Sequence, residues 1–183
     1  RTEFTERVVR PPSRARILDV GCGTGDLLAF LPTGAEYWGW DVSRAYINAA
    51  RARFGSRGHF VSGLITEADV MAMPPFDLVI ACGVLHHLDD DAATTLLRLG
   101  RMALRHGGRF VSLDCAVVPG QNPMARLLID LDRGQNVRHP EGYLDLARPV
   151  FDRVDGVLRH RAWVPYTYWM MEAAVAGEPG RDD

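Results

Sequence analysis

The chain has 183 residues, of which 47% are hydrophobic and 24% charged, which suits one globular domain with a substantial core. Its 21 basic residues are all arginines, and with 23 acidic residues the formal net charge is −2, which disfavours a nucleic-acid or membrane-surface protein with a basic face. The absence of lysine from the sequence excludes a lysine Schiff base and a P-loop lysine on a nucleotide phosphate.

Cysteine content and the length of apolar runs indicate the expected cellular compartment and whether the chain spans a membrane. The three cysteines (Cys22, Cys82 and Cys115) are too few and too scattered for a disulfide framework or a zinc site. An odd number of thiols fits a reducing compartment, so we expect a cytoplasmic protein. No run approaches the roughly 18 apolar residues that span a bilayer, and no signal segment opens the chain, so we expect no membrane partner. No metal-binding pattern such as HExxH occurs, and the oligomeric state is not predicted.

Short apolar runs alternate with helical segments along the chain. Helices are predicted around 25–31 and from Ser43, a good N-cap, to Phe54, with Gly55 as the stop. The predicted strands, in chain order, are 15–20, 36–41, 59–62, 76–81 and 109–115. This alternation predicts a parallel sheet with helices on both faces, in which ligands bind beyond the carboxyl ends of the strands.

The helix before the fifth predicted strand has the clearest end signals. Three aspartates, 89–91, lie at its N-terminus, and Arg101, Arg105 and His106 lie in its last turns. Both ends therefore complement the helix dipole, and Gly107 is predicted to end the helix. The segments predicted after the fifth strand are helices near 123–132 and 140–149 and strands around 152–159 and 162–170. We expect one domain, 1–183, with a frayed tail over 177–183.

A glycine-rich loop joins the first strand to the first helix, within Asp19–Asp26 (DVGCGTGD). Its alternating glycines allow a sharp turn and let a ligand approach the backbone closely. A dinucleotide fingerprint would place its third glycine at position 26, where this chain has an aspartate. A carboxylate there would face a pyrophosphate at a helix N-terminus, so the spacing disfavours NAD and FAD.

Four features in sequence order resemble the class I S-adenosylmethionine-dependent methyltransferases. They are ILDVGCGTG, Asp41 at the end of the second strand and 22 residues after Asp19, PFDLVIACGVLHHLDD, and GGRFVSLD, which together cover residues 16–115. The resemblance implies S-adenosylmethionine as cofactor and S-adenosylhomocysteine as its product. With the later strands, we predict an α/β fold: a Rossmann-like, doubly wound, seven-stranded sheet, mostly parallel with one antiparallel edge strand.

The resemblance also implies which residues bind the cofactor. Gly21 and Gly23 would border its methionyl part, and Val42 would lie against its adenine. Asp41 would accept hydrogen bonds from both ribose hydroxyls, as a carboxylate can. The full implied set is Asp19, Gly21, Cys22, Gly23, Asp41, Val42, Leu64 and Cys82.

The chain departs from the family pattern after the third strand. Members often have an acidic residue there, near the adenine amino group, whereas this chain has Gly63 and Leu64. Two arrangements are open at this point. Either Leu64 and backbone groups form the adenine wall, or Glu67 or Asp69 reaches back from the following loop.

Two adjacent histidines, His86 and His87, follow the fourth strand and are expected at the carboxyl end of the sheet, beside the cofactor. A histidine there can accept a proton from a substrate hydroxyl. We predict His87 as this general base and Asp114, which ends the neighbouring strand, as the carboxylate that orients it. The alternative is that one of the pair only packs or caps the next helix.

The predicted function is methyl transfer from S-adenosylmethionine to a small molecule, at oxygen with a histidine base. Residues 119–140, flanked by proline and glycine, are predicted to close over the acceptor as a lid. A methyltransferase for RNA or protein usually shows a basic groove or an Asn/Asp-Pro-Pro-Tyr/Phe motif after strand four, where this chain has ACGV, so no nucleic-acid partner is expected. The alternative is a catalytically silent methyltransferase-like subunit that binds the cofactor or a partner protein.

Overall fold

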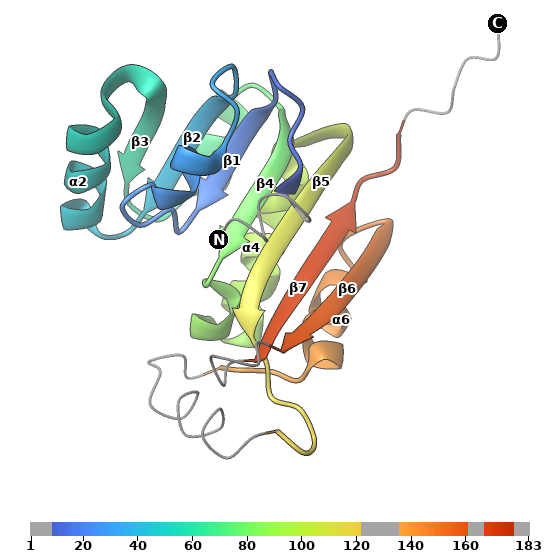
Figure 1. Cartoon of the computed structure of the whole chain (residues 1–183). Coiled ribbons are helices and arrows are strands. Elements are labelled where there is room, and N and C mark those ends of the chain that lie inside the picture. The colour runs from blue at the N-terminus through green and yellow to red at the C-terminus, as the bar shows by residue number, and fades with distance from the viewer. Residues whose placement is uncertain (1–8, 122–135, 161–166, 178–183) are drawn as a thin grey trace, which may run out of the picture.

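The computed structural model describes residues 9–121, 136–160 and 167–177, and in these ranges seven strands form one sheet in the order β3-β2-β1-β4-β5-β7-β6 (Figure 1). The strands are β1 (Arg16–Val20), β2 (Glu36–Asp41), β3 (Gly58–Ser62), β4 (Phe76–Cys82), β5 (Leu104–Cys115), β6 (Arg153–His160) and β7 (Thr167–Ala174). The α-helices described are α2 (Arg44–Phe54), α3 (Glu67–Ala72), α4 (Asp90–Ala103) and α6 (Pro140–Ala147). Short 3-10 helices are η2 (Asp26–Phe30), η3 (Gly55–Arg57) and η4 (Leu85–His87).

The strand directions confirm the predicted doubly wound, mostly parallel sheet. β3, β2, β1, β4 and β5 are parallel to their neighbours, and β7 is antiparallel to both β5 and β6. The antiparallel strand lies one position inside the edge, and β6 forms the edge itself. This order arises because β6 runs in the same direction as β5, with α6 between them in the chain, and β7 then pairs with both.

Apolar strand residues form two core clusters, one on each face of the sheet. In β4 the residues alternate between them: Leu78 and Ile80 pack with side chains of η2 and α2, and Val79 packs with side chains of α3 and α4. All three are at most 1% exposed. Figure 1 shows α4 and α6 behind the sheet in this view. A strand covered on both faces is apolar along its whole length, which explains the continuous run in the sequence.

Helix starts follow the predicted caps. The Ser43 side chain accepts a hydrogen bond from the Tyr46 N–H, and α2 ends at Gly55 as predicted. Asp89 likewise accepts from the Ala92 N–H at the start of α4. These starts are local events, since each depends on one side chain and an N–H group three residues later.

The predicted C-terminal end of α4, the helix between β4 and β5, was wrong. α4 ends at Ala103, so Arg105, His106 and Gly107 lie in β5 rather than in the last helical turn. Leu104 leaves the helix with extended backbone angles, is buried, and pairs with Phe76 of β4. Burial of Leu104 against the sheet therefore outweighs the interaction of the arginines with the helix dipole.

Other elements differ in detail. The predicted helix around 25–31 is the 3-10 helix η2, and α3 was not predicted although Thr66 and Asp69 form a capping box at its start. The predicted segments 140–149, 152–159 and 162–170 correspond to α6, β6 and a β7 that begins at Thr167. The helix predicted near 123–132 lies outside the described residues. The same holds for residues 122–135 of the predicted lid and 178–183 of the predicted tail.

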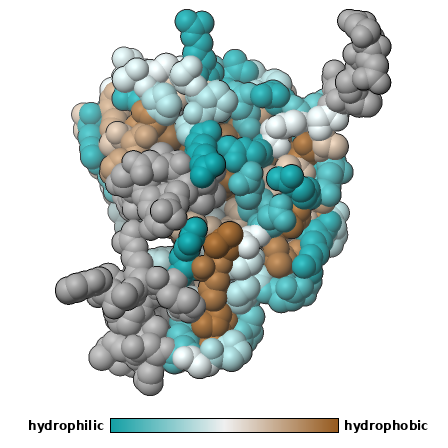
Figure 2. Space-filling view, turned by 45° about the vertical axis from the view of Figure 1, so that its right-hand side comes forward, coloured by the Kyte–Doolittle hydropathy of each residue, from teal (hydrophilic) through white to brown (hydrophobic). Residues whose placement is uncertain are grey.

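The molecular surface is mixed in polarity. Figure 2, which brings the β6 and β7 side forward, shows hydrophobic areas separated by hydrophilic ones. Val157 on β6 is one of the large hydrophobic side chains that are exposed, at 49%. Among the described residues, no helix has the length and apolar character needed to cross a bilayer.

Asp77 on β4 ties three strands together at their amino-terminal ends. Its Oδ2 accepts a hydrogen bond from the Arg16 N–H of β1 at 2.7 Å, and its Oδ1 accepts from Arg105 of β5. Burial alone would raise the pKa of Asp77, but the Arg16 N–H and the Arg105 guanidinium offset it, so the pKa lies below its ordinary value. The charged carboxylate therefore stabilises the folded state.

Asp77→Asn should lower the free energy of unfolding at neutral pH by about 1.5 kcal/mol, the lower end for hydrogen bonds to a charged group, because the site is partly exposed. A carboxyl whose folded pKa is depressed stabilises above its unfolded pKa, and that contribution disappears as the pH falls through the folded value. Urea unfolding between pH 7 and pH ~3 should therefore show the difference shrinking below about pH 4. Asp155→Asn, at an exposed pair with Arg153, is the control. A difference that is constant across this range would contradict the prediction.

Candidate functional site

The glycine loop, residues 21–25, turns sharply after β1. Gly21, Gly23 and Gly25 all have positive φ angles, at 74°, 56° and 73°. The N–H groups of Gly21 and Cys22 both donate to the Trp40 carbonyl of β2, at 2.7 and 3.0 Å. A Cβ at position 21 would lie 2.4 Å from Val84 Cγ2, whereas one at position 23 would meet nothing within 4 Å. The loop is thus packed on one side and open on the other.

Asp41, the last residue of β2, is held by two backbone groups. Its Oδ2 accepts from the Gly23 N–H at 2.8 Å, and its Oδ1 accepts from the Ser43 N–H at 2.7 Å. The carboxylate therefore links the glycine loop to the start of α2. Each carboxylate oxygen has two lone pairs, so both oxygens can accept one further hydrogen bond from a ligand.

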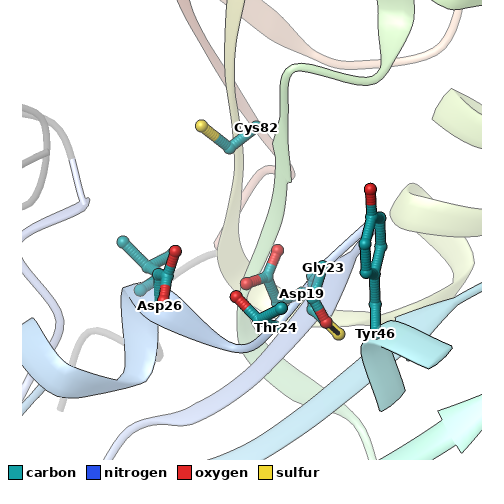
Figure 3. A pocket seen from close by; sticks show the side chains of 9 residues that line it. Asp19, Gly23, Thr24, Asp26, Tyr46 and Cys82 are labelled. Carbon is teal, nitrogen blue, oxygen red and sulfur yellow. Dashed lines mark hydrogen bonds between the residues drawn. The ribbon is translucent and has the colours of Figure 1, made fainter. Parts of the chain in front are cut away.

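A pocket of about 340 Å³ lies at the carboxyl ends of β1 and β4 (Figure 3). Its lining residues are Asp19, Gly21, Cys22, Gly23, Thr24, Asp26, Leu27, Tyr46 and Cys82. Five of these belong to the eight cofactor residues predicted from the sequence, namely Asp19, Gly21, Cys22, Gly23 and Cys82. The other four were missed. Three of them could have been predicted from their position in the sequence, because the glycine motif continues through Thr24, Asp26 and Leu27 into η2.

The remaining predicted cofactor residues lie beside the pocket rather than in its lining. Val42 and Leu64 follow β2 and β3 and are 66% and 79% exposed, which is high for large apolar side chains. The Gly63 N–H donates to the Asp41 carbonyl at 3.0 Å, so these two strand ends are adjacent. Two exposed apolar side chains, Val42 and Leu64, thus follow adjacent strand ends near Asp41.

Asp69, one of the two acidic candidates after β3, takes part in a helix cap. Its Oδ2 accepts from both the N–H and the hydroxyl of Thr66, at 2.9 and 2.6 Å, in the capping box that starts α3. The Thr66 hydroxyl and N–H lower the pKa of Asp69. Asp69 is therefore held at the helix start through Oδ2. Glu67, the other acidic candidate, is exposed in the first turn of α3, so both arrangements after β3 stay open.

The pocket floor is acidic. Asp19 is 2% exposed and accepts a hydrogen bond from the Tyr37 hydroxyl at 2.6 Å. Burial, with the Asp19 and Asp41 carboxylates, raises the pKa of the Cys22 thiol far above its ordinary value, so Cys22 stays protonated and is a poor nucleophile. Asp26 pairs with Arg53 at the rim. The charges at this site thus suit a ligand that carries positive groups.

The structure places the two histidines differently from the prediction. They lie in η4, hereafter the histidine turn. His86 is 5% exposed, and its Nδ1 lies 2.9 Å from Oδ1 of Asp114, which is 1% exposed. The His86 N–H also donates to this oxygen, at 3.3 Å. His87 is exposed, and its ring lies against that of His86 with centroids 4.1 Å apart. The predicted pairing of His87 with Asp114 was therefore wrong.

The tight turn explains this difference. Leu85 is buried in the core next to β4, so the following residue faces β5, where Asp114 lies, and His87 is left on the outside. A Cβ at Gly83 would lie 3.8 Å from Cε1 of His86, and Gly83 directly follows the pocket residue Cys82. The histidine turn thus begins three residues after the pocket residue Cys82, at the same strand end.

This geometry fixes what the His86 ring can do. With Nδ1–H donated to the Asp114 carboxylate, the lone pair of Nε2 is the one that can accept a proton. No cluster of three or more possible metal ligands occurs within residues 9–121, 136–160 and 167–177. The carboxyl edge of the sheet therefore holds both an acidic pocket and an imidazole that Asp114 orients.

Comparison with known sequences gives consistent matches. A family model described as a methyltransferase domain matches residues 18–110, just over half of the chain. The methyltransferase GfsG of Streptomyces halstedii is 30% identical over 138 residues, covering 70% of this chain and 49% of that protein. Acetylserotonin O-methyltransferase of Mus musculus is 32% identical over 185 residues, covering 91% and 46%. The chain spans less than half the length of either of these curated relatives.

Solved structures show the same fold. The pyocyanin biosynthetic protein PhzM is similar with a TM-score of 0.72 and 20% identity, covering 96% of this chain and 54% of that one. Human N-acetylserotonin methyltransferase, solved in complex with SAM, is similar with a TM-score of 0.69 and 20% identity, covering 96% and 51%. From the family match, the glycine loop and the sheet order, this chain belongs to the class I family of S-adenosylmethionine-dependent methyltransferases.

Proposed function

We propose that this domain transfers a methyl group from S-adenosylmethionine to an oxygen atom of a small molecule. The observation that carries the proposal is the buried His86–Asp114 pair at 2.9 Å, whose histidine lies in the turn that follows β4 and its pocket residue Cys82. When bound, S-adenosylmethionine supplies a methyl group that its positively charged sulfur makes electrophilic. The protein has to hold the acceptor in line and to accept its proton.

The pocket and the residues beside it support binding of this cofactor. A volume of about 340 Å³ is within the range of small-molecule sites. Asp41 presents two oriented oxygens to a ribose diol, and Val42 and Leu64 present apolar surface to an adenine ring. Asp19 would supply negative charge for the ammonium and sulfonium groups.

His86 is the proposed general base, in place of His87. Asp114 holds the imidazole in one tautomer and stabilises the imidazolium that forms when Nε2 takes the proton of a hydroxyl acceptor. The acetylserotonin relative acts at oxygen, as its name states, which supports an oxygen acceptor here. The predicted cytoplasmic location, the lack of a nucleic-acid partner and the lid over 119–140 stay predictions.

Asp41→Ala should weaken binding of S-adenosylhomocysteine by about 10- to 150-fold, because hydrogen bonds to a charged acceptor are worth about 1.5–3 kcal/mol. Titration calorimetry with purified protein measures this directly. Asp41→Asn, which keeps the size and removes the charge, should weaken binding as well. Asp91→Ala, an exposed acid in the first turn of α4, is the control and should bind normally. Unchanged affinity of Asp41→Ala would remove Asp41 from the cofactor site.

His86→Ala should lower kcat by about 10²–10⁴-fold, the usual contribution of a general base, and should leave S-adenosylhomocysteine affinity nearly unchanged. The assay is transfer of a radiolabelled methyl group from S-adenosylmethionine to a panel of phenols, enols and aliphatic alcohols, followed by kinetics with the best acceptor.

His87→Ala is the matched control and should retain most of the turnover. An equal loss in both variants, or none in His86→Ala, would count against His86 as the base. Tight cofactor binding without transfer to any acceptor would instead support the catalytically silent subunit.

A further inference from the structure

Arg138 reaches the histidine turn from the segment before α6. Its side chain is 11% exposed. Its Nη1 donates to the Leu85 carbonyl at 2.9 Å, and its Nη2 donates to the Leu88 carbonyl at 2.7 Å. These two carbonyls belong to the residues immediately before and after the two histidines. One guanidinium therefore holds both ends of the turn that carries His86.

The guanidinium makes five hydrogen bonds, as many as it has N–H donors. In addition to the two carbonyls of the turn, it donates to the Asn136 carbonyl at 3.1 Å. Asp90 Oδ1 accepts from Nε and from Nη2, at 3.0 and 2.7 Å. A lysine has three donors on a single nitrogen and cannot reproduce this planar pattern. The site is specific for arginine.

The backbone around Arg138 strengthens the same connection. The Asn136 N–H donates to the His86 carbonyl at 3.0 Å, and the Val117 N–H donates to the Arg138 carbonyl at 3.1 Å. Val117 lies just beyond the end of β5, three residues after Asp114. The segment is therefore attached to the histidine on one side and to the strand that carries its carboxylate on the other.

Tyr143 anchors the far side of this segment. Its hydroxyl accepts from the Arg138 N–H at 3.4 Å and donates to the Cys115 carbonyl at 2.8 Å, next to Asp114. Tyr143 is 1% exposed, and the Arg138 guanidinium lies 5.7 Å from its ring centroid. Arg138 is thus fixed by contacts that do not involve the histidine, so it can impose a position on the turn.

We propose that Arg138 is a positioning residue for methyl transfer, which acts by holding the histidine turn so that His86 meets both Asp114 and the acceptor. The proposal rests on the function proposed above, in which His86 is the base. Arg138 itself touches no reacting atom. Loss of its bonds to the Leu85 and Leu88 carbonyls would let the turn shift relative to Asp114. Displacements of about 1 Å in a catalytic arrangement can cost 10²-fold in rate.

The test is a double-mutant cycle between positions 138 and 86. Arg138→Gln should lower kcat by about 10²-fold with the best acceptor, while KM and S-adenosylhomocysteine affinity change little. Combined with His86→Ala, the same substitution should have almost no further effect, within about twofold, because the group that it positions is already absent. Arg138→Lys should resemble Arg138→Gln, and Asp90→Asn should cause a smaller loss in the same direction.

Arg148→Gln is the control, because Arg148 is exposed just beyond the end of α6 and pairs with Glu141 and Asp145. It should leave kcat unchanged. If Arg138→Gln fails to fold, the same double-mutant cycle with His86→Ala is measured with Arg138→Lys and with Asp90→Asn. An unchanged kcat in the position-138 variants, or an equal loss with and without His86, overturns the positioning role. Normal turnover in His86→Ala overturns the proposed base itself, and the two failures are therefore distinguishable.

Discussion

The central place of β4, between β1 and β5, is the constraint on which the site depends. The three strands are parallel, so their carboxyl ends meet at one edge of the sheet. The glycine loop follows β1, the histidine turn follows β4, and Asp114 lies at the end of β5. Val84 packs against Gly21 on one side of the central strand end, and His86 meets Asp114 on the other. The glycine-loop pocket and the His86–Asp114 pair therefore lie at the same edge of the sheet because of the strand order, although the sequence separates Gly21 from His86 by about 60 residues.

Several arginine side chains in this chain, which has no lysine, donate hydrogen bonds to backbone carbonyls. Arg57 donates to the Leu31 and Pro32 carbonyls after η2, and Arg51 donates to the Phe60 carbonyl of β3. Arg138 does the same at both ends of the histidine turn. Carbonyls at the ends of short helices and strands lack regular partners, and a planar guanidinium can satisfy two of them at once. The arginines thus stabilise connections as well as forming ion pairs at the surface.

The sequence was sufficient for those parts of the molecule that depend on local pattern. Strand positions followed from apolar runs, helix starts from Ser43 and Asp89, and the glycine-rich turn after β1 from its spaced glycines. The partner of Asp114 could not be found this way, because a 3-10 turn decides which of two adjacent histidines faces β5. Tyr46 was missed for a similar reason, since only the packing of α2 brings it over the glycine loop. The end of α4 depended on the burial of Leu104 against β4, a tertiary contact that outweighs end-of-helix charge.

The two backbone hydrogen bonds to Asp41 have a consequence for the thermodynamics of binding. An acidic side chain at a surface usually samples several rotamers, and a ligand that engages it must offset the entropy lost when one is selected. Here the N–H groups of Gly23 and Ser43 have already selected the rotamer during folding. A diol bound by Asp41, as proposed above, would meet an acceptor in a single orientation, so more of the hydrogen-bond energy would be retained as affinity. The entropy lost by ordering the Asp41 side chain is therefore part of the free energy of folding and not of binding. It arises where the glycine loop meets α2.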